Sequence, residues 1–365
     1  MQFELPCYKN PDFLLEAFSG APDAKLEAVV QVGVAPDGFH ANTIFPEYFK
    51  LDGIWHLATD SRMDCVTVAK PAPDGSWLLD VKEFRRLALG DRVVVGRTED
   101  ASEGIFVHVD GFRGNSAGTD VFAFRTGRSR ETSYSRDYDR LYELLRFEKD
   151  HGHVVWVLGP AAVFDSDSRN ALVSLIEKGY VHAVFGGNAL ATHDMEGEFF
   201  RTALGQDIYT QVSLPNGHYN HLDVINAARK AGSLKALQEA GRLRGGVVNA
   251  CLKHHIPLVL AGSIRDDGPL PGVIADVYAA QDAMRTEIRK ATTVLGLATQ
   301  LHSIATGNMT PSYRMADGAL RPVYIYSVDV SEFAVNKLRD RGTLEVTSIV
   351  TNIQDFLVNL ERNLP

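Results

Sequence analysis

The feature that most limits the fold is an alternation, from about residue 151 onward, of short apolar runs with helix-length segments. The runs His153–Leu158, Val181–Phe185 and Pro257–Ala261 are mostly apolar, and a glycine follows each of them. Apolar runs separated by helices are typical of a parallel sheet that is covered on both faces. The same pattern predicts further strands at 294–298 and 323–328, and helices at 168–177, 222–231, 234–240, 273–289, 333–339 and 353–360.

The first third of the chain has a different pattern. Between residues 25 and 124, short strand-like runs are separated by Asp-Gly pairs at positions 37–38, 52–53, 74–75 and 110–111. Tight turns between antiparallel strands need positive φ, which Asp and Gly adopt readily. We therefore predict a β-rich domain over residues 1–135 and an α/β domain over 136–365, with a linker or substrate lid at 111–135 and a helix at 138–149.

Charge and composition narrow the class of function. The chain has a net charge of −9, which argues against nucleic acid or an anionic membrane as a partner because both bind basic surfaces. No apolar run approaches the length of a membrane span and the N-terminus lacks a signal-peptide pattern, so we expect a cytoplasmic protein. The cysteines Cys7, Cys65 and Cys251 have neither disulfide nor metal-binding spacing, and we expect no metal.

Ligands of a parallel α/β sheet bind outside the carboxyl ends of the strands. Small residues there let backbone N–H groups approach a phosphate at the start of a helix. The GxGxxG fingerprint is missing, so Gly186-Gly187 fits either a dinucleotide site or a plain turn, and Asp329 fits either a ribose contact or a helix cap. The residues that we expect at these strand ends are Gly159-Pro160, Gly186 to Asn188, Gly262 to Gly268, Thr306 to Asn308, and Asp329.

Histidines form one polar cluster near the predicted strand ends. His193 is followed by Asp194, and His218 and His221 occur close together further along the chain. No HExxH or similar metal-binding spacing is present. Because imidazole titrates near neutral pH, proton transfer is the favoured role for this cluster.

A second polar cluster follows the predicted strand at 257–261. Arg265, Asp266 and Asp267 are suited to hold a zwitterion, with the carboxylates facing an ammonium group and the guanidinium facing a carboxylate. A salt bridge within the loop is the structural alternative, since charges beside a buried strand must be used or paired. Cys251 fits either a catalytic thiol or a small core residue on a helix.

Several of these segments resemble the archaeal ornithine cyclodeaminase family, which also forms the C-terminal part of cyanobacterial enzymes that convert arginine to proline. The resemblance rests on His193-Asp194, Gly217-His218 with His221, Ala261–Pro271 and Leu301–Met309. It implies an α/β fold with an N-terminal β-rich LOR/SDH-type domain and a Rossmann-like, deoxyhypusine-synthase-like NAD-binding domain. It also implies assembly into homodimers or homotetramers, with a small amino acid as the substrate.

The reaction that the resemblance implies is redox-neutral. Hydride leaves Cα of the amino acid for the nicotinamide, the side-chain amine attacks the resulting imine, ammonia departs, and the hydride returns to give proline. The cofactor stays bound, because released NADH would strand the intermediate.

Motif matching and charge together assign candidate roles. The catalytic candidates are Asp266 and Asp267, for the ammonium contact and proton transfer, and secondarily Cys251. The substrate-binding candidates are Arg265 for the α-carboxylate, Asn42 as a second contact there, and His193 or His218 near substrate or phosphate. The candidates for binding NAD are Gly187, Asn188, Ala189, Gly262, Ser263, Ile264, Thr306, Asn308 and Asp329.

Two alternatives remain open. The chain has Ala250, Arg125 and Asn352 where the family usually carries a glutamate, an apolar residue and an aspartate, and these departures fit a cyclodeaminase or NAD-dependent dehydrogenase for another amino acid. An NAD-binding regulatory module without turnover is the alternative of another class. Ammonia release without net NADH distinguishes cyclodeamination from a dehydrogenase.

Overall fold

The computed structural model describes residues 3–112, 135–266, 268–316, 318–331 and 344–365. Most of the predicted linker at 111–135, the predicted helix at 333–339, and the residues Arg125 and Asp267 lie outside the described residues.

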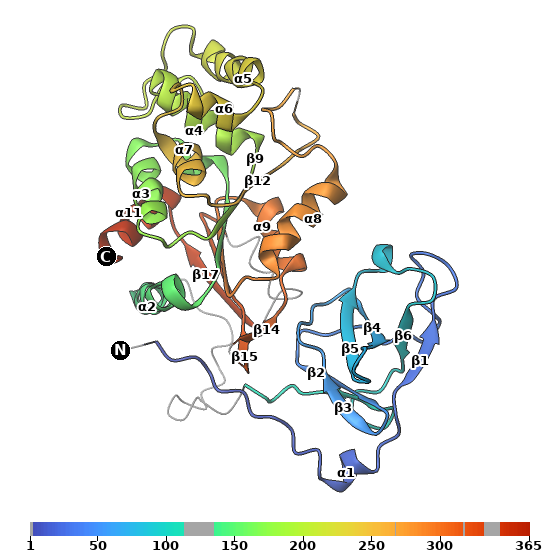
Figure 1. Cartoon of the computed structure of the whole chain (residues 1–365). Coiled ribbons are helices and arrows are strands. Elements are labelled where there is room, and N and C mark those ends of the chain that lie inside the picture. The colour runs from blue at the N-terminus through green and yellow to red at the C-terminus, as the bar shows by residue number, and fades with distance from the viewer. Residues whose placement is uncertain (1–2, 113–134, 267, 317, 332–343) are drawn as a thin grey trace.

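The second part of the chain is built on a six-stranded sheet whose neighbouring strands are all parallel (Figure 1). The spatial order β12-β9-β8-β13-β16-β17 corresponds to 3-2-1-4-5-6 in chain order, which is the usual Rossmann order. The chain therefore changes direction across the sheet between β8 and β13. The predicted parallel sheet is confirmed, with strands β8 Val154–Leu158, β9 Ala183–Gly187, β12 Leu258–Ala261, β13 Thr293–Leu297, β16 Tyr324–Asp329 and β17 Glu345–Val350.

Alternating strand residues are buried against helices on opposite faces of this sheet. Trp156 and Tyr326 pack with α2, α3, α7 and α11, whereas Val157 and Ile325 pack with α8 and α9. Helices α4, α5 and α6 form a further cluster beside β12. The helices are α2 Ser135–His151, α3 Ser166–Glu177, α4 Asn188–Phe200, α5 Asn220–Ala231, α6 Leu234–Glu239, α7 Gly246–Lys253, α8 Val277–Ile288, α9 Gln300–Met309 and α11 Ile353–Asn363.

The first part of the chain contains two small antiparallel sheets, with orders β1-β6-β4-β5 and β3-β2-β7. Asp52 and Gly53 have positive φ at the turn between β2 and β3, as the Asp-Gly pair predicts. Phe49 and Ile105 are fully buried in the core of this region. Its elements are α1 Glu16–Ser19, β1 Lys25–Ala28, β2 Glu47–Leu51, β3 Ile54–Leu57, β4 Val66–Pro71, β5 Trp77–Lys82, η1 Phe84–Arg86, β6 Arg92–Val95 and β7 Ile105–Val107.

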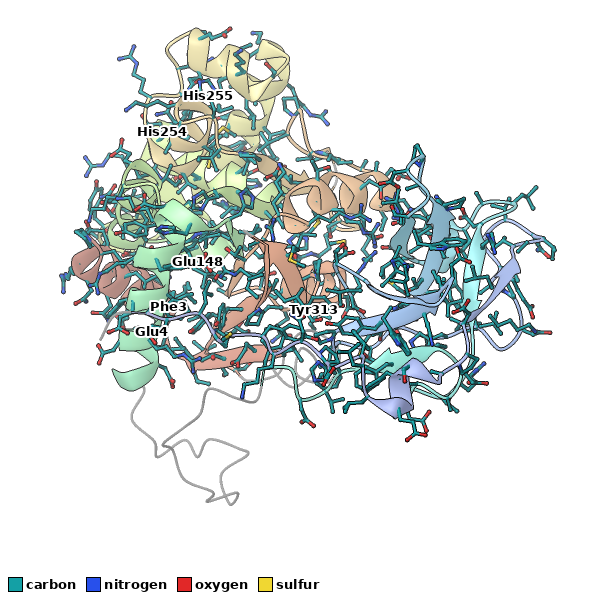
Figure 2. All side chains as sticks on the ribbon, turned by 60° about the horizontal axis from the view of Figure 1, so that its bottom comes forward. Phe3, Glu4, Glu148, His254, His255 and Tyr313 are labelled. Carbon is teal, nitrogen blue, oxygen red and sulfur yellow. The ribbon has the colours of Figure 1, made fainter. Side chains whose placement is uncertain are left out.

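A hairpin joins the two parts at the end of the parallel sheet where the strands begin, which we call the amino edge. This hairpin, β14 Tyr313–Ala316 and β15 Ala319–Pro322, leads directly into β16. Its Tyr313 hydroxyl donates to the Ala58 carbonyl at 2.8 Å, and Figure 2 shows Tyr313 and Glu148 from the side of this edge. Phe3 adds a second connection, because its ring packs against Phe147 and Tyr324. The opposite end of the sheet is the carboxyl edge.

Candidate functional site

The carboxyl ends of β8 and β13 meet where the sheet order reverses. Gly159 follows β8, and its N–H donates to the Leu297 carbonyl at 2.8 Å. A Cβ at this position would lie 1.9 Å from the carbonyl oxygen of Ala298. Only glycine therefore allows the two loops to meet at this point.

Helix α4 begins at the next strand end. Gly187 is its N-cap residue and supplies no side-chain cap, so the first backbone N–H groups of the helix, including those of Asn188 and Ala189, are available to a ligand. A Cβ on Gly187 would lie 3.3 Å from Cε1 of His302. The side chain of His302, which comes from α9 in the other half of the sheet, thus reaches the start of α4.

The carboxylate of Asp266 stabilises the loop after β12 by a hydrogen bond within that loop. The backbone N–H of Ser263 donates to Oδ2 of Asp266 at 2.8 Å, while Ile264 and Arg265 are exposed to solvent. Within the described residues Arg265 makes no ion pair, so the salt bridge considered for this loop does not form between Arg265 and Asp266.

The same loop is tied to its neighbours at both ends. The Gly262 N–H donates to the Ile274 carbonyl at 2.8 Å, and a Cβ on Gly262 would lie 2.9 Å from that oxygen. Further along, the Leu270 N–H donates to Oδ1 of Asn188 at 3.0 Å. This last bond brings the loop after β12 against the start of α4.

His302 completes this group of residues. Burial lowers the pKa of its imidazole, while the nearby carboxylate of Asp266 acts in the opposite direction. The net lowering favours the neutral ring at pH 7. The sequence analysis did not single out His302, although this residue lies within the Leu301–Met309 segment. Its place in the first turn of a helix that follows a buried strand could have indicated it.

Of the three remaining predicted cofactor contacts, two have a setting other than the predicted one. Thr306 and Asn308 lie in the last turns of α9, so the prediction that they follow a strand is wrong. Thr306 is fully buried and Asn308 is exposed. Asp329 does end β16, and its carboxylate accepts a hydrogen bond from the Ser331 N–H at 3.1 Å. This contact matches the cap-type alternative for Asp329.

The histidines of the predicted cluster lie in different environments. His193 lies on α4 with its Nδ1 2.7 Å from Oε2 of Glu196, and its ring centroid is 6.2 Å from that of His221. Asp194 instead accepts bonds from Arg169 and from the first N–H groups of α7. His218 is exposed on the short turn η3 Gly217–Tyr219.

Cys251 and the neighbouring Ala250 lie inside the protein. Both are part of the core cluster formed by α7 and the sheet. Burial, with a further contribution from Asp194, raises the pKa of the Cys251 thiol to about 12. Because the thiolate is the reactive form, this environment favours the packing alternative for Cys251 over the catalytic one.

Asn42 lies among buried polar groups of the β-rich region. Its Nδ2 donates to Thr67 Oγ1 at 2.8 Å and also to Glu47. The backbone N–H of Glu47 donates to the Tyr313 hydroxyl at 3.4 Å, which associates Asn42 with the amino edge. The structure therefore does not bring Asn42 together with Arg265 within one chain.

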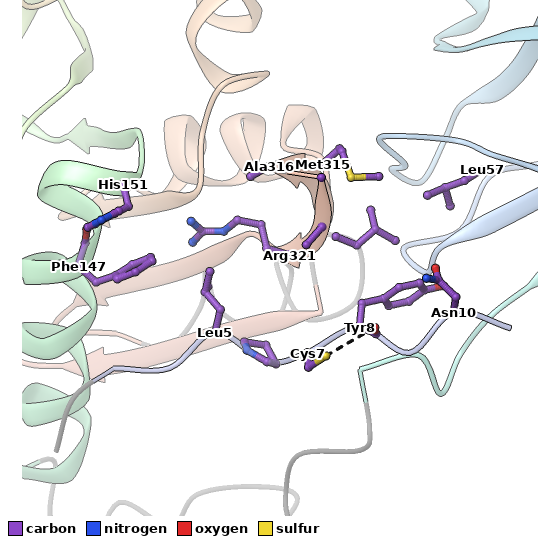
Figure 3. A pocket seen from close by; sticks show the side chains of 14 residues that line it. Leu5, Cys7, Tyr8, Asn10, Leu57, Phe147, His151, Met315, Ala316 and Arg321 are labelled. Atoms are coloured by element: carbon purple, nitrogen blue, oxygen red, sulfur yellow. Dashed lines mark hydrogen bonds between the residues drawn. The ribbon is translucent and has the colours of Figure 1, made fainter.

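A cavity of about 420 Å³ also lies at the amino edge, far from the glycine-lined strand ends (Figure 3). Leu5, Phe147 and Met315 contribute to its mostly apolar wall. The charged group at this wall, Arg321, is paired with Glu148. The carboxyl edge, and not this cavity, is therefore the candidate site.

No group of three or more His, Cys, Asp or Glu side chains is arranged to hold a metal ion in the described part of the chain. Among the same residues, no helix combines the length and apolarity needed to cross a bilayer.

Comparison with known sequences identifies relatives over nearly the whole chain. The family described as arginine dihydrolase ArgZ-like, C-terminal, Rossmann fold matches residues 141–360. An ornithine cyclodeaminase of Methanopyrus kandleri is 38% identical over 98% of this chain and 84% of the relative. The bifunctional arginine dihydrolase/ornithine cyclodeaminase AgrE of Nostoc sp. is 37% identical over 94% of this chain, which spans 47% of AgrE.

Solved structures agree with the fold. A putative LOR/SDH protein from Methanococcus maripaludis has a TM-score of 0.83 at 34% identity, covering 94% of this chain and 98% of the other. The ternary complex of AgrE with ornithine and NAD+ has a TM-score of 0.59 at 36% identity, covering 94% of this chain and 46% of AgrE.

Proposed function

The chain belongs to the family of the ornithine cyclodeaminases and of the C-terminal Rossmann-fold part of ArgZ-like arginine dihydrolases, and from this premise we propose that it is an NAD-dependent ornithine cyclodeaminase. The observation that carries the proposal is the 38% identity to an ornithine cyclodeaminase across 98% of this chain, which includes the β-rich region as well as the parallel sheet. The AgrE relative with ornithine and NAD+ bound supports the same pairing of substrate and cofactor.

The carboxyl edge fits a dinucleotide. Gly187, Asn188 and Ala189 supply an uncapped helix start for a pyrophosphate, and Gly262 lets the loop after β12 pack closely against the backbone at Ile274. Bound NAD would accept a hydride from the substrate Cα and return it later in the same turnover.

The charged loop fits an amino acid. Arg265 is exposed and pairs with no acid of the described residues, so its guanidinium is suited to a bidentate contact with the α-carboxylate. Asp266 uses Oδ2 to accept the Ser263 N–H, which leaves Oδ1 for a substrate ammonium group. The neutral imidazole of His302 is suited to accept a proton from the α-amine. Asp267 remains a candidate from the sequence.

Two of the positions at which the chain departs from its family have structural roles. Ala250 is buried, and Asn352 caps α11 by accepting the Gln354 N–H at 2.8 Å. An aspartate makes the same capping contact, so the asparagine does not by itself require another substrate.

The proposed activity is tested by comparing the amounts of the products that are formed. Purified protein is incubated with L-ornithine and NAD, and ammonia, proline and free NADH are measured together. Equal amounts of ammonia and proline without net NADH are expected. Accumulating NADH indicates a dehydrogenase instead, and NAD binding without turnover of any amino acid indicates a regulatory module.

We further propose a cytoplasmic homodimer or homotetramer that keeps NAD bound through purification. Native mass spectrometry measures both properties at once, because the assembly mass and any bound dinucleotide appear in the same spectrum. A monomer without NAD would contradict this part of the proposal.

A further inference from the structure

Glu196 on α4 is a fully buried carboxylate with an unusual set of partners. It accepts hydrogen bonds from the Thr202 hydroxyl at 2.8 Å and from the Gly205 N–H at 2.9 Å. Its ion-pair partner in the described part of the chain is His193, with Oε2 2.7 Å from Nδ1. No Lys or Arg pairs with Glu196 there, so the imidazole is the group that balances its charge.

These contacts determine which ring nitrogen of His193 carries hydrogen. An ionised Glu196 can only accept hydrogen bonds, so Nδ1 of His193 must be the donor. Burial acts to raise the pKa of Glu196, but the bonds from His193, Gly205 and Thr202 outweigh it and lower the pKa, which keeps the carboxylate ionised. Nε2 of His193 is therefore the atom that is left to exchange a proton.

The surroundings leave this Nε2 available. It makes no hydrogen bond within the described residues, and the His193 side chain is 11% exposed. The Phe164 ring forms a T-shaped pair with the imidazole, with centroids 5.5 Å apart, and the ring of His221 from α5 lies 6.2 Å from it. Glu196 and His221 are thus the titratable groups that face His193 in this part of the chain.

His193 lies on a helix that begins at the carboxyl edge of the sheet. Helix α4 follows β9, and Phe164 ends the turn η2 Pro160–Val163 that follows β8. His193 therefore lies between the segments that leave two adjacent strands at this edge. Asp194, the next residue, contacts Arg169 and α7 instead and does not compete for the imidazole.

We propose that Glu196 is a positioning residue that holds His193 with Nδ1 protonated, so that Nε2 delivers the proton to the departing ammonia; this rests on the proposed cyclodeaminase function. In that step the ring nitrogen of the cyclic aminal donates its electron pair to form a C=N bond, and the C–NH2 bond breaks with its electrons leaving on nitrogen. The Nε2 proton of the imidazolium converts this nitrogen to ammonia. His193 is left neutral and takes up a proton from water before the next turnover.

The main test compares Glu196→Gln with Thr202→Val, a matched control that removes another donor to the same carboxylate. Glu196→Gln is expected to lower kcat at least tenfold with little change in KM. Because the anionic partner is lost, the alkaline limb of the kcat profile should move to lower pH by about one pH unit or more. Thr202→Val should keep both limbs in place. An unchanged profile in Glu196→Gln, with loss of stability alone, would overturn the proposal.

A second measurement does not depend on turnover. In 15N spectra of histidine-labelled wild-type protein, assigned with His193→Gln, the His193 signals should show the Nδ1–H tautomer at high pH. A wild-type Nε2–H tautomer would refute the role of Glu196 even if Glu196→Gln fails to fold. If ornithine is not turned over but Nδ1–H is found, the proposed function fails while the positioning contact stands.

Discussion

The two edges of the parallel sheet differ in whether their charged side chains are buried and paired. At the amino edge, the fully buried Glu148 accepts hydrogen bonds from Arg321, Thr292 and Thr293. At the carboxyl edge, Arg265 is exposed without an ion pair to any described residue. Buried polar groups that satisfy one another stabilise a fold, whereas polar groups left open beside glycine-lined strand ends are available to a ligand. The amino edge therefore has a structural role, and the carboxyl edge is the one at which we propose that ligands bind.

The interface between the two parts of the chain also contains charged groups that are paired with one another. Glu83 beside η1 pairs with Arg62 at 2.6 Å and with Arg285 of α8. Burial lowers the pKa of Arg285 to about 10, and the neighbouring Arg62 adds to this while Glu83 opposes it. Arg285 therefore stays charged at neutral pH and holds the β-rich region against α8.

The largest expected effect is at the amino edge. Glu148→Ala leaves the buried Arg321 without its partner, and we expect the free energy of unfolding in urea to fall by about 3–5 kcal/mol. Glu361→Ala removes a half-exposed ion pair with Lys178 and should cost less than about 1 kcal/mol. Similar losses in both variants would contradict the structural role assigned to this edge.

The next effect is on substrate affinity. Arg265→Met removes the proposed carboxylate contact, and KM for ornithine should rise about 10–100-fold while stability changes by less than about 0.5 kcal/mol. Arg362→Met removes another exposed arginine, on α11, and should leave steady-state kinetics unchanged. An unaltered KM in Arg265→Met would remove this residue from the site.

A smaller effect is expected for the cofactor. Gly187→Ala places a Cβ 3.3 Å from Cε1 of His302, so the imidazole or the start of α4 must shift, and the affinity for NAD measured by calorimetry should fall about tenfold. Gly197→Ala offers a control on the same helix, since its Cβ would also lie 3.3 Å from a side chain, that of Arg169. Equal affinities for NAD in the two variants would count against a pyrophosphate at Gly187.

The smallest effect concerns pH at the amino edge. Burial, aided by His182, lowers the pKa of His153 to about 4, so the unfolded chain binds a proton below pH 6.5 that the folded protein does not. Stability should therefore fall as pH drops from 6.5 to 4, with His153 contributing at most about 1.4 kcal/mol per pH unit. Urea unfolding of His153→Gln should show a shallower fall than wild type, and exposed His151→Gln should match wild type.

Much of the fold could be predicted from local patterns. The apolar runs at 153–158 and 257–261 required buried parallel strands, and the Asp52-Gly53 turn required a hairpin. The hairpin β14–β15 and the edge strand β17 were not predicted, because their residues mix polar and apolar side chains without a clear strand pattern. Helix α4 was also missed, since its buried polar residues conceal the helical period.

The sequence by itself determined the parallel sheet and the family, because strand burial and short motifs are local properties of the chain. Only the tertiary structure decided that His302 meets Gly187, that Glu196 holds His193, and that Asn42 and Cys251 lie elsewhere. The physical reason is that these outcomes depend on how α9 and α4 pack across a sheet whose strand order reverses. The spacing of residues along the chain does not show which side chains this packing brings within a few ångströms of one another.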